Sequence, residues 1–332
     1  MKTINAHHTS HEGHQPIRVL SHNLIGNHEN THAKFLKAQI EATKKGLQAG
    51  ISYYVNDFPI LNQRNGQHQI PNISADNKIN IHETFCSYLW CISYSIPVFY
   101  DEGIAKANLN LIAGKEEYKI DTELLNNVQQ LFDYAMTVIT AIVPWDKAQL
   151  VNPELYSEEE KFWVERANSI YLYAANFMLC HEFAHFDLGH LEMGKRLKLK
   201  NHHWVQLERE ADQHAIKLLM KGNSKQLDRT LKVGILIGMI SLLFLNRMTV
   251  MTKHPHTDER IHSFLMQLQL EDNDPLWAMA CIGYKLWDSQ FNHSMDFITS
   301  QTSYRKLYFD IKKQFQEVLK WLPIAICMAL LS

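Results

Sequence analysis

The sequence predicts an α+β fold that is mostly α, with a small N-terminal β-sheet followed by a helical body. Alternating and β-branched segments between Asn, Gly and Pro residues predict strands at 51–69 and 78–82. A helix is expected at 32–50, with Gly50 as its C-terminal stop. Beyond Glu83 the periodicity is helical almost throughout, and the expected helices are 83–106, 122–143, 157–190, 205–221, 226–246, 257–270, 275–290 and 296–321.

Four segments are expected along the chain, and we expect them to form one compact unit. They are a His-rich leader at 1–32, an N-terminal α+β region at 33–120, a helical core at 121–270 and a C-terminal helical cap at 271–332. The leader is polar, and we expect it to be poorly ordered rather than metal-binding. Its histidines are His7, His8, His11, His14, His22, His28 and His32.

Composition narrows the class of protein. Hydrophobic residues make up 46% of the chain, which excludes a disordered protein. The formal net charge is −2, without long runs of one sign, so no nucleic-acid partner is expected. Five cysteines without a CxxC pair fit a reducing compartment, and the N-terminus lacks the apolar region of a secretory signal. We therefore expect a cytoplasmic protein.

Two apolar stretches were tested as membrane spans. As a helix, Val233–Leu245 would reach roughly 20 Å, whereas a bilayer core requires about 30 Å. The tail at 322–331 is shorter and contains Pro323. We expect both to be buried helices and no transmembrane span, while peripheral membrane contact stays open for either stretch.

The helix expected from residue 157 contains the candidate functional residues. Ser157 and Glu160 form a capping box at its start. The later stretch Ile170–Cys180 is apolar on nearly every face, which is typical of a helix at the centre of a core. The residues that follow are therefore expected to lie in a buried place.

Those residues form an HExxH motif. Four residues along a helix rotate by about 40° net, so His181 and His185 project from one face and can share one tetrahedral ion. Glu182 lies about 100° further round, where it can act as a general base beside the open coordination position. A second HExxH match at 28–32 is polar and has nothing upstream to bury it, so we do not expect it to bind metal.

A third ligand is expected from the next helix. Glu208 and Asp212 are four residues apart on one face, and two histidines plus Glu208 make the donor set of one catalytic Zn²⁺ ion. Asp212 is expected to orient a ligand histidine. The alternative is a solvated acidic helix face. Glu210 points elsewhere and is the weaker ligand candidate.

Three further residues were weighed as parts of the site. On a continuing helix His190 would lie roughly opposite His181, so a structural role at the helix end is expected for it. His254 could approach the metal as a fourth ligand or donate to the developing oxyanion. Arg260 could pair with Asp212 or with Glu259, and a structural ion pair is the favoured interpretation.

The order HExxH, ExxAD, apolar helix and HPxxxERI resembles the HtpX-type gluzincin metallopeptidases, and more closely the phage-exclusion Lit-type peptidases. The resemblance covers about the last three quarters of the chain and is specific from 174 to 263. The stretches that carry it are HEFAHFDLGH within 174–190, QLEREADQHAIKLLMKG at 206–222, the apolar helix at 233–245, KHPHTDERIHS at 253–263 and, more loosely, 83–100.

This resemblance implies a zincin-like core and a cytosolic suicide protease. Lit-like enzymes cleave elongation factor Tu when a phage capsid peptide activates them, so a protein substrate and a phage-protein activator are expected. Two alternatives stay open: an HtpX- or ImmA-like metallopeptidase with another protein substrate, and a zinc-stabilised binding protein without activity. The lack of a membrane span weighs against HtpX itself, and an intact Glu182 weighs against a purely structural site.

Overall fold

The computed structural model describes residues 3–4, 15–21, 23–24, 33–52, 59–61, 68–114, 119–221, 228–245, 254–297 and 302–329. The seven leader histidines and the second HExxH match lie outside these residues, as does most of the expected strand region at 51–69. The four-segment division therefore stays a prediction.

Two small sheets contain the strands. β2 (Gln48–Ser52) runs parallel to β4 (Lys78–His82), and β3 (Asn72–Ile73) pairs antiparallel with the other edge of β4. The order is thus β2-β4-β3, with Gly50 opposite Asn80. Elsewhere β1 (Thr3–Ile4) and β5 (Leu155–Tyr156) form a two-stranded antiparallel pair.

Helices make up the rest of the fold, which confirms the predicted α+β, mostly α class. A 3₁₀ turn η2 (Pro16–Leu20) precedes them, and a π-helical turn η3 (Asp101–Ala105) joins α3 to α4. The α-helices are α2 (Ala33–Lys44), α3 (Glu83–Tyr100), α4 (Lys106–Ile112), α5 (Thr122–Thr140), α6 (Glu158–Asp187), α7 (His190–Arg196), α8 (Asn201–Met220), α9 (Asp228–Ser241), α10 (Thr257–Gln267), α11 (Pro275–Phe291) and α12 (Tyr304–Ala329).

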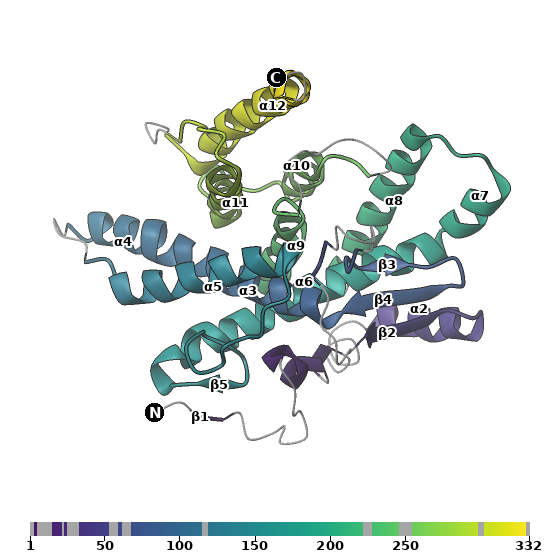
Figure 1. The fold of residues 1–332 in the computed structure, drawn as a ribbon, viewed down its shortest axis with the longest axis horizontal. Helices are drawn as coiled ribbons and strands as arrows, with labels where there is room; N and C mark the ends of the chain where they lie inside the picture. Colours follow the sequence, from purple (N-terminus) through teal and green to yellow (C-terminus); the bar gives the residue numbers. More distant parts are fainter. Residues whose placement is uncertain are drawn as a thin grey trace.

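The long helix α6 lies at the centre of the molecule. It packs against α3, α8 and α9, and the three-stranded sheet lies against its C-terminal half (Figure 1). α4 and α5 extend at one end, and α7 and the start of α8 project at the other. α11 packs against α3 and α9, and α12 lies on α11 at the top of the view. Ala174, Phe177 and Cys180 of α6 are fully buried, as its apolar pattern predicted.

The first helix ends earlier than predicted. α2 stops at Lys44, because Gly46 adopts φ +96° and the Leu47 amide donates to the Ala42 carbonyl at 3.0 Å. This hydrogen bond closes the helix end as in a Schellman motif. Gly50, the predicted stop, instead lies in β2. The prediction chose the wrong one of two nearby glycines.

Two other helix boundaries also differ from prediction. The helix expected at 157–190 ends at Asp187, where Gly189 takes φ +74° and lets the chain turn into α7, which was not expected. The last helix begins at Tyr304 rather than 296, after Ser303 accepts a hydrogen bond from the Lys306 amide. It also continues past Pro323.

α9 crosses α6 at close range in the core. A Cβ on Gly234 would lie 2.4 Å from Cβ of Tyr173 and 3.0 Å from the carbonyl oxygen of Ile170. A Cβ on Gly238 would lie 3.1 Å from Phe177. Because the two glycines let the backbones of α9 and α6 come into contact, this crossing fixes the position of α6 relative to α9 in the core.

The apolar stretch predicted as a buried helix is confirmed as one. α9 is almost entirely buried, and Leu243 and Phe244 after it have 0% and 1% exposure. None of the helices in the described ranges combines the length and the apolar character that crossing a bilayer requires.

Substitution of Gly234 by Val should destabilise the fold by about 1–3 kcal/mol, because the added methyl groups would overlap the backbone of α6. Urea unfolding followed by circular dichroism measures this. Gly103→Ala is the matched control, since nothing lies within 4 Å of a Cβ at that position. An unfolding free energy equal to wild type in Gly234→Val would show that the crossing is not tightly packed.

Candidate metal centre

The motif helix begins with the predicted cap. Ser157 accepts from the Glu160 amide at 3.2 Å, and Glu160 accepts from the Ser157 amide at 2.7 Å. From this start α6 runs for more than seven turns into the core and brings His181, Glu182 and His185 to buried positions. The predicted buried setting of the motif is therefore confirmed.

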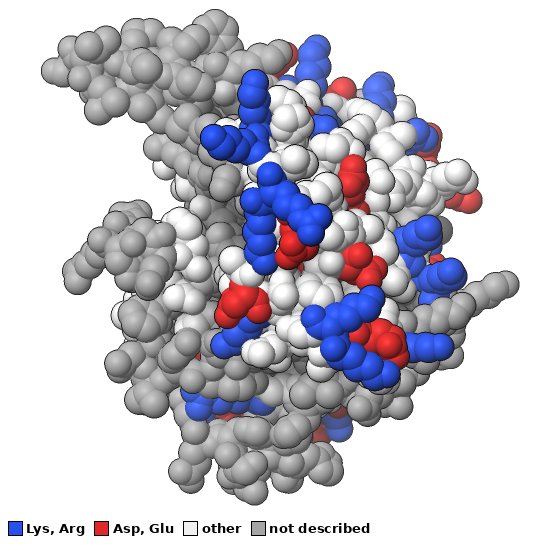
Figure 2. Space-filling model, turned by 90° about the vertical axis from the view of Figure 1, so that its right-hand side faces the viewer, with Lys and Arg blue, Asp and Glu red and all other residues white. Residues whose placement is uncertain are grey.

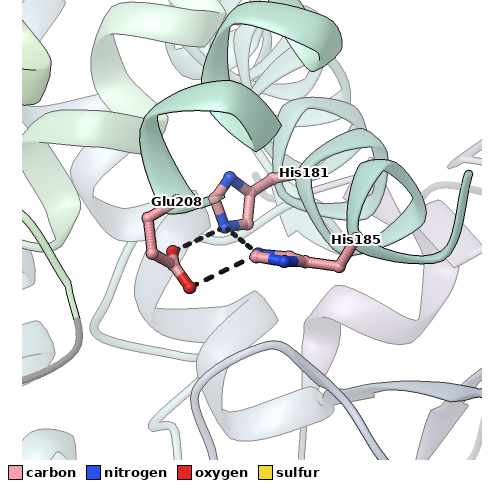
Figure 3. Close-up of side chains that lie close together, drawn as sticks. All are labelled: His181, His185 and Glu208. Atoms are coloured by element: carbon pink, nitrogen blue, oxygen red, sulfur yellow. Dashed lines mark hydrogen bonds and ion pairs between the residues drawn. The ribbon is translucent and has the colours of Figure 1, made fainter. Parts of the chain in front are cut away.

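Three side chains converge on one point (Figure 3). Nε2 of His181 lies 3.1 Å from Oε2 of Glu208, and Nε2 of His185 lies 3.4 Å from Oε1 of the same carboxylate. The two Nε2 atoms are 3.3 Å apart. Tetrahedral zinc with bonds of about 2.0–2.1 Å has ligand-to-ligand distances of roughly 3.3 Å. These three side chains therefore fit one metal ion of that geometry.

The outer nitrogens of both imidazoles are also held. Nδ1 of His181 lies 2.9 Å from Oδ1 of Asp212, so with a metal bound at Nε2 the ring can donate its Nδ1 proton to this carboxylate. Nδ1 of His185 lies 3.0 Å from Nδ1 of His190. Both rings are thus oriented from behind, as the ligand histidines of metal sites are.

Arg260 and Asp212 form a buried ion pair. Arg260 donates through Nε to Oδ2 at 2.7 Å and through Nη2 to Oδ1 at 2.6 Å. The other predicted partner, Glu259, instead pairs with Arg209 at the surface. Burial raises the pKa of the Asp212 carboxyl, but the Arg260 charge and the bond to His181 outweigh it and hold that pKa below its ordinary value.

The acidic residues of α8 do not form a solvated face. Glu208 and Asp212 have only 5% and 6% exposure, which excludes that alternative. Burial opposes the charge of Glu208, yet hydrogen bonds with His181, His185 and His254 bring the pKa of its carboxyl well below its usual range. Glu210 is half exposed and lies outside the donor cluster.

His190 lies behind His185 rather than opposite His181. The break at Gly189 turns the chain, so that the buried His190 ring contacts His185 while its Nε2 lies 3.5 Å from Oε2 of Glu210. The geometry expected on a continuing helix is therefore wrong, although His190 is outside the three-residue donor cluster. Burial and the neighbouring His185 lower the pKa of His190.

A cleft of about 410 Å³ opens onto the donor set and is lined by Glu182. Burial raises the pKa of the Glu182 carboxyl above its ordinary value. Nδ1 of His254 lies 2.9 Å from Oε2 of Glu208, and its side chain is 64% exposed at the rim. The apolar lining of the cleft comes from Leu61, Ile70, Pro71, Met178, Leu242 and Leu245.

Sequence analysis missed two cleft residues, His68 and His256. His68 forms an isolated antiparallel bridge with Leu61, and His256 directly precedes α10. No periodicity links such positions to the HExxH helix.

A buried two-histidine, one-carboxylate donor set beside an open cleft, with a further glutamate at the opening, is the arrangement of a metallohydrolase. Comparison with known families agrees with that class. A family model described as peptidase U49 matches residues 79–280, more than half of the chain and all of the site, so the chain belongs to the peptidase U49 family. No curated protein and no solved structure matches it.

Replacing Asp212 with Leu should destabilise the metal-free protein by about 3–5 kcal/mol, because the buried Arg260 guanidinium would lose its carboxylate. The double variant Asp212→Leu/Arg260→Met removes both charges and should recover most of that loss. Urea unfolding of all three proteins with a chelator present measures both effects. A single variant as stable as wild type would contradict a structural role for the pair.

The metal-free protein should also lose stability as the pH rises. Burial lowers the pKa of His181, but its bonds to Asp212 and Glu208 raise that pKa to about 10. A histidine whose pKa is raised in the folded state contributes its full stabilisation of the fold below the unfolded pKa of about 6.5. This stabilisation is lost as the pH rises to the folded pKa. The measurement is the difference in unfolding free energy between wild type and His181→Gln across this window. A difference independent of pH would contradict the raised pKa.

Proposed function

We propose that this protein is a zinc-dependent endopeptidase whose metal is held by His181, His185 and Glu208. The observation that carries the proposal is the convergence of these three side chains at one edge of a cleft that Glu182 also lines. Membership of the peptidase U49 family supports peptide-bond hydrolysis. The donor set supports zinc, because two histidines, one carboxylate and an open position are typical of catalytic zinc.

The state of Glu182 favours an enzyme over a zinc-stabilised binding protein. Its carboxylate is buried, with 9% exposure, and has no hydrogen bond or ion pair to any residue in the described ranges. Glu182 lines the cleft beside the donor set, and a purely structural site has no use for an unbonded carboxylate at that place. Facing the cleft with a raised pKa, it suits proton transfer near neutral pH.

The chain's own residues supply the proton transfers. When bound, zinc would polarise the scissile carbonyl and make water more acidic. Glu182 takes a proton from the attacking water and then passes it to the leaving amine. Asp212, held by Arg260, fixes the His181 ring, and His190 contacts the His185 ring from the other side. His254, at the rim, is placed to donate to the oxygen that becomes negative.

We further propose that the enzyme is a latent cytoplasmic protease of phage defence, of the Lit type, with a translation factor such as elongation factor Tu as its substrate. What supports this is the HEFAHFDLGH, ExxAD and HPxxxERI order of the sequence together with membership of the U49 family. Unregulated proteolysis would harm the cell that makes the enzyme. A phage protein is therefore the proposed activator.

The test compares bacterial lysates by mass spectrometry after induction of wild type or Glu182→Gln, with and without phage infection. The variant should bind one zinc ion and lose cleavage by about 10²–10⁴-fold or more, because only the base is removed. Glu159→Gln, an exposed acid at the start of α6, is the matched control and should cleave normally.

Each part of the proposal has its own contrary outcome. Equal cleavage by Glu182→Gln would remove that residue from the mechanism. Cleavage that persists after zinc has been removed would show that the reaction does not require the metal. Fragments from a protein unrelated to translation, or constant toxicity without phage, would contradict the defence role while leaving the peptidase intact.

A further inference from the structure

The segment between the second and third ligands forms a projecting helical hairpin. After His185 the chain turns at Gly189, runs through α7, and returns along α8 to Glu208. Figure 1 shows α7 and the start of α8 extending from the body at one end of the molecule. Residues 195–203, at the end of this hairpin, are exposed apart from Leu199.

Two contacts hold this hairpin together. A Cβ on Gly194 would lie 2.6 Å from Cη2 of Trp204, so the indole of α8 lies directly on the backbone of α7. The Lys200 amide donates to Nδ1 of His203 at 3.1 Å, which caps the start of α8. The side chains at the tip are therefore presented from a supported backbone.

The tip carries positive charge that the surrounding structure does not balance. Lys195 pairs with Glu192 at 3.2 Å, but Arg196, Lys198 and Lys200 have no acidic partner within ion-pair distance in the part of the chain that the structure describes. Figure 2, which faces this end of the molecule, shows several groups of Lys and Arg side chains on this face, with Asp and Glu side chains beside many of them. These three cations are available to a partner.

An apolar side chain stands among these cations. Leu197 lies between Arg196 and Lys198 and is 56% exposed. A leucine exposed to this degree gains free energy if a partner covers it, at about 25 cal/mol per Å² of apolar area. The combination of an exposed apolar centre and a charged surround is typical of protein interfaces.

We propose that this basic tip is a docking surface for an acidic segment of the protein substrate that also carries an apolar side chain to cover Leu197. The tip is made of Arg196, Leu197, Lys198 and Lys200. The inference rests on the proposed peptidase function. A cleft of about 410 Å³ holds only the residues next to the scissile bond. An enzyme that selects one protein therefore gains specificity from contacts elsewhere, and charged surfaces supply them by steering and register.

The observations favour a protein partner over a membrane or a nucleic acid. One exposed leucine offers too little apolar area to hold a lipid surface, and three unpaired cations contribute only about 1 kcal/mol each near anionic lipid. The whole chain has a net charge of −2, which opposes binding to a polyanion outside this tip.

The experiment measures binding of a fluorescein-labelled peptide, Glu-Glu-Leu-Glu-Glu, to the full-length zinc-loaded Glu182→Gln protein by fluorescence anisotropy. The triple variant Arg196→Glu/Lys198→Glu/Lys200→Glu should weaken binding by about tenfold or more at low salt, and less at high salt. Lys119→Glu/Lys306→Glu/Lys313→Glu makes the same change in net charge at exposed sites away from the tip and should bind like the parent protein.

Cleavage gives a second measurement. In an otherwise wild-type enzyme the tip variant should raise KM for the wild-type-specific substrate identified in the lysate, with kcat unchanged. Equal weakening by both triple variants would overturn the proposal, as would preferential binding of phosphatidylglycerol vesicles or single-stranded RNA. Peptide binding at the tip without any proteolysis would instead contradict the peptidase function and leave the docking surface standing.

Discussion

The site depends on the interactions of one buried carboxylate, that of Asp212. It lies on α8, accepts two hydrogen bonds from Arg260 on α10 and faces the His181 ring on α6, so one side chain joins three helices. α10 is held in turn by α12, where Lys312 lies 3.7 Å from Asp258. Because a buried charge is tolerated only with its partners in place, these helices can pack in only one relative register.

Helix geometry made the cluster of candidate metal ligands predictable from sequence. Tertiary packing determined the features that the sequence did not predict. His181 and His185 follow from i, i+4 spacing on an apolar helix, and Glu208 and Asp212 follow from the same spacing on the next one. The fold class followed from periodicity in the same way. The position of His190 did not, because it depends on a left-handed turn at Gly189 that helical periodicity cannot reveal.

The cleft was the least predictable part of the molecule. Its walls combine a loop near Ile70, the end of the buried stretch after α9 and the residues before α10, which are distant in sequence. Loop positions such as His68 carry no periodic signal, and their proximity arises only when the sheet packs on α6. Sequence therefore predicted the chemistry of the donors but not the shape around them.

Glu182 differs from the other acids of the centre in its bonding. The other buried acids of the centre, Glu208 and Asp212, are neutralised by neighbours, whereas Glu182 is buried without a bonded partner in the described structure. Among the described acids of the centre, Glu182 is thus the one that the fold leaves available to a molecule entering the cleft.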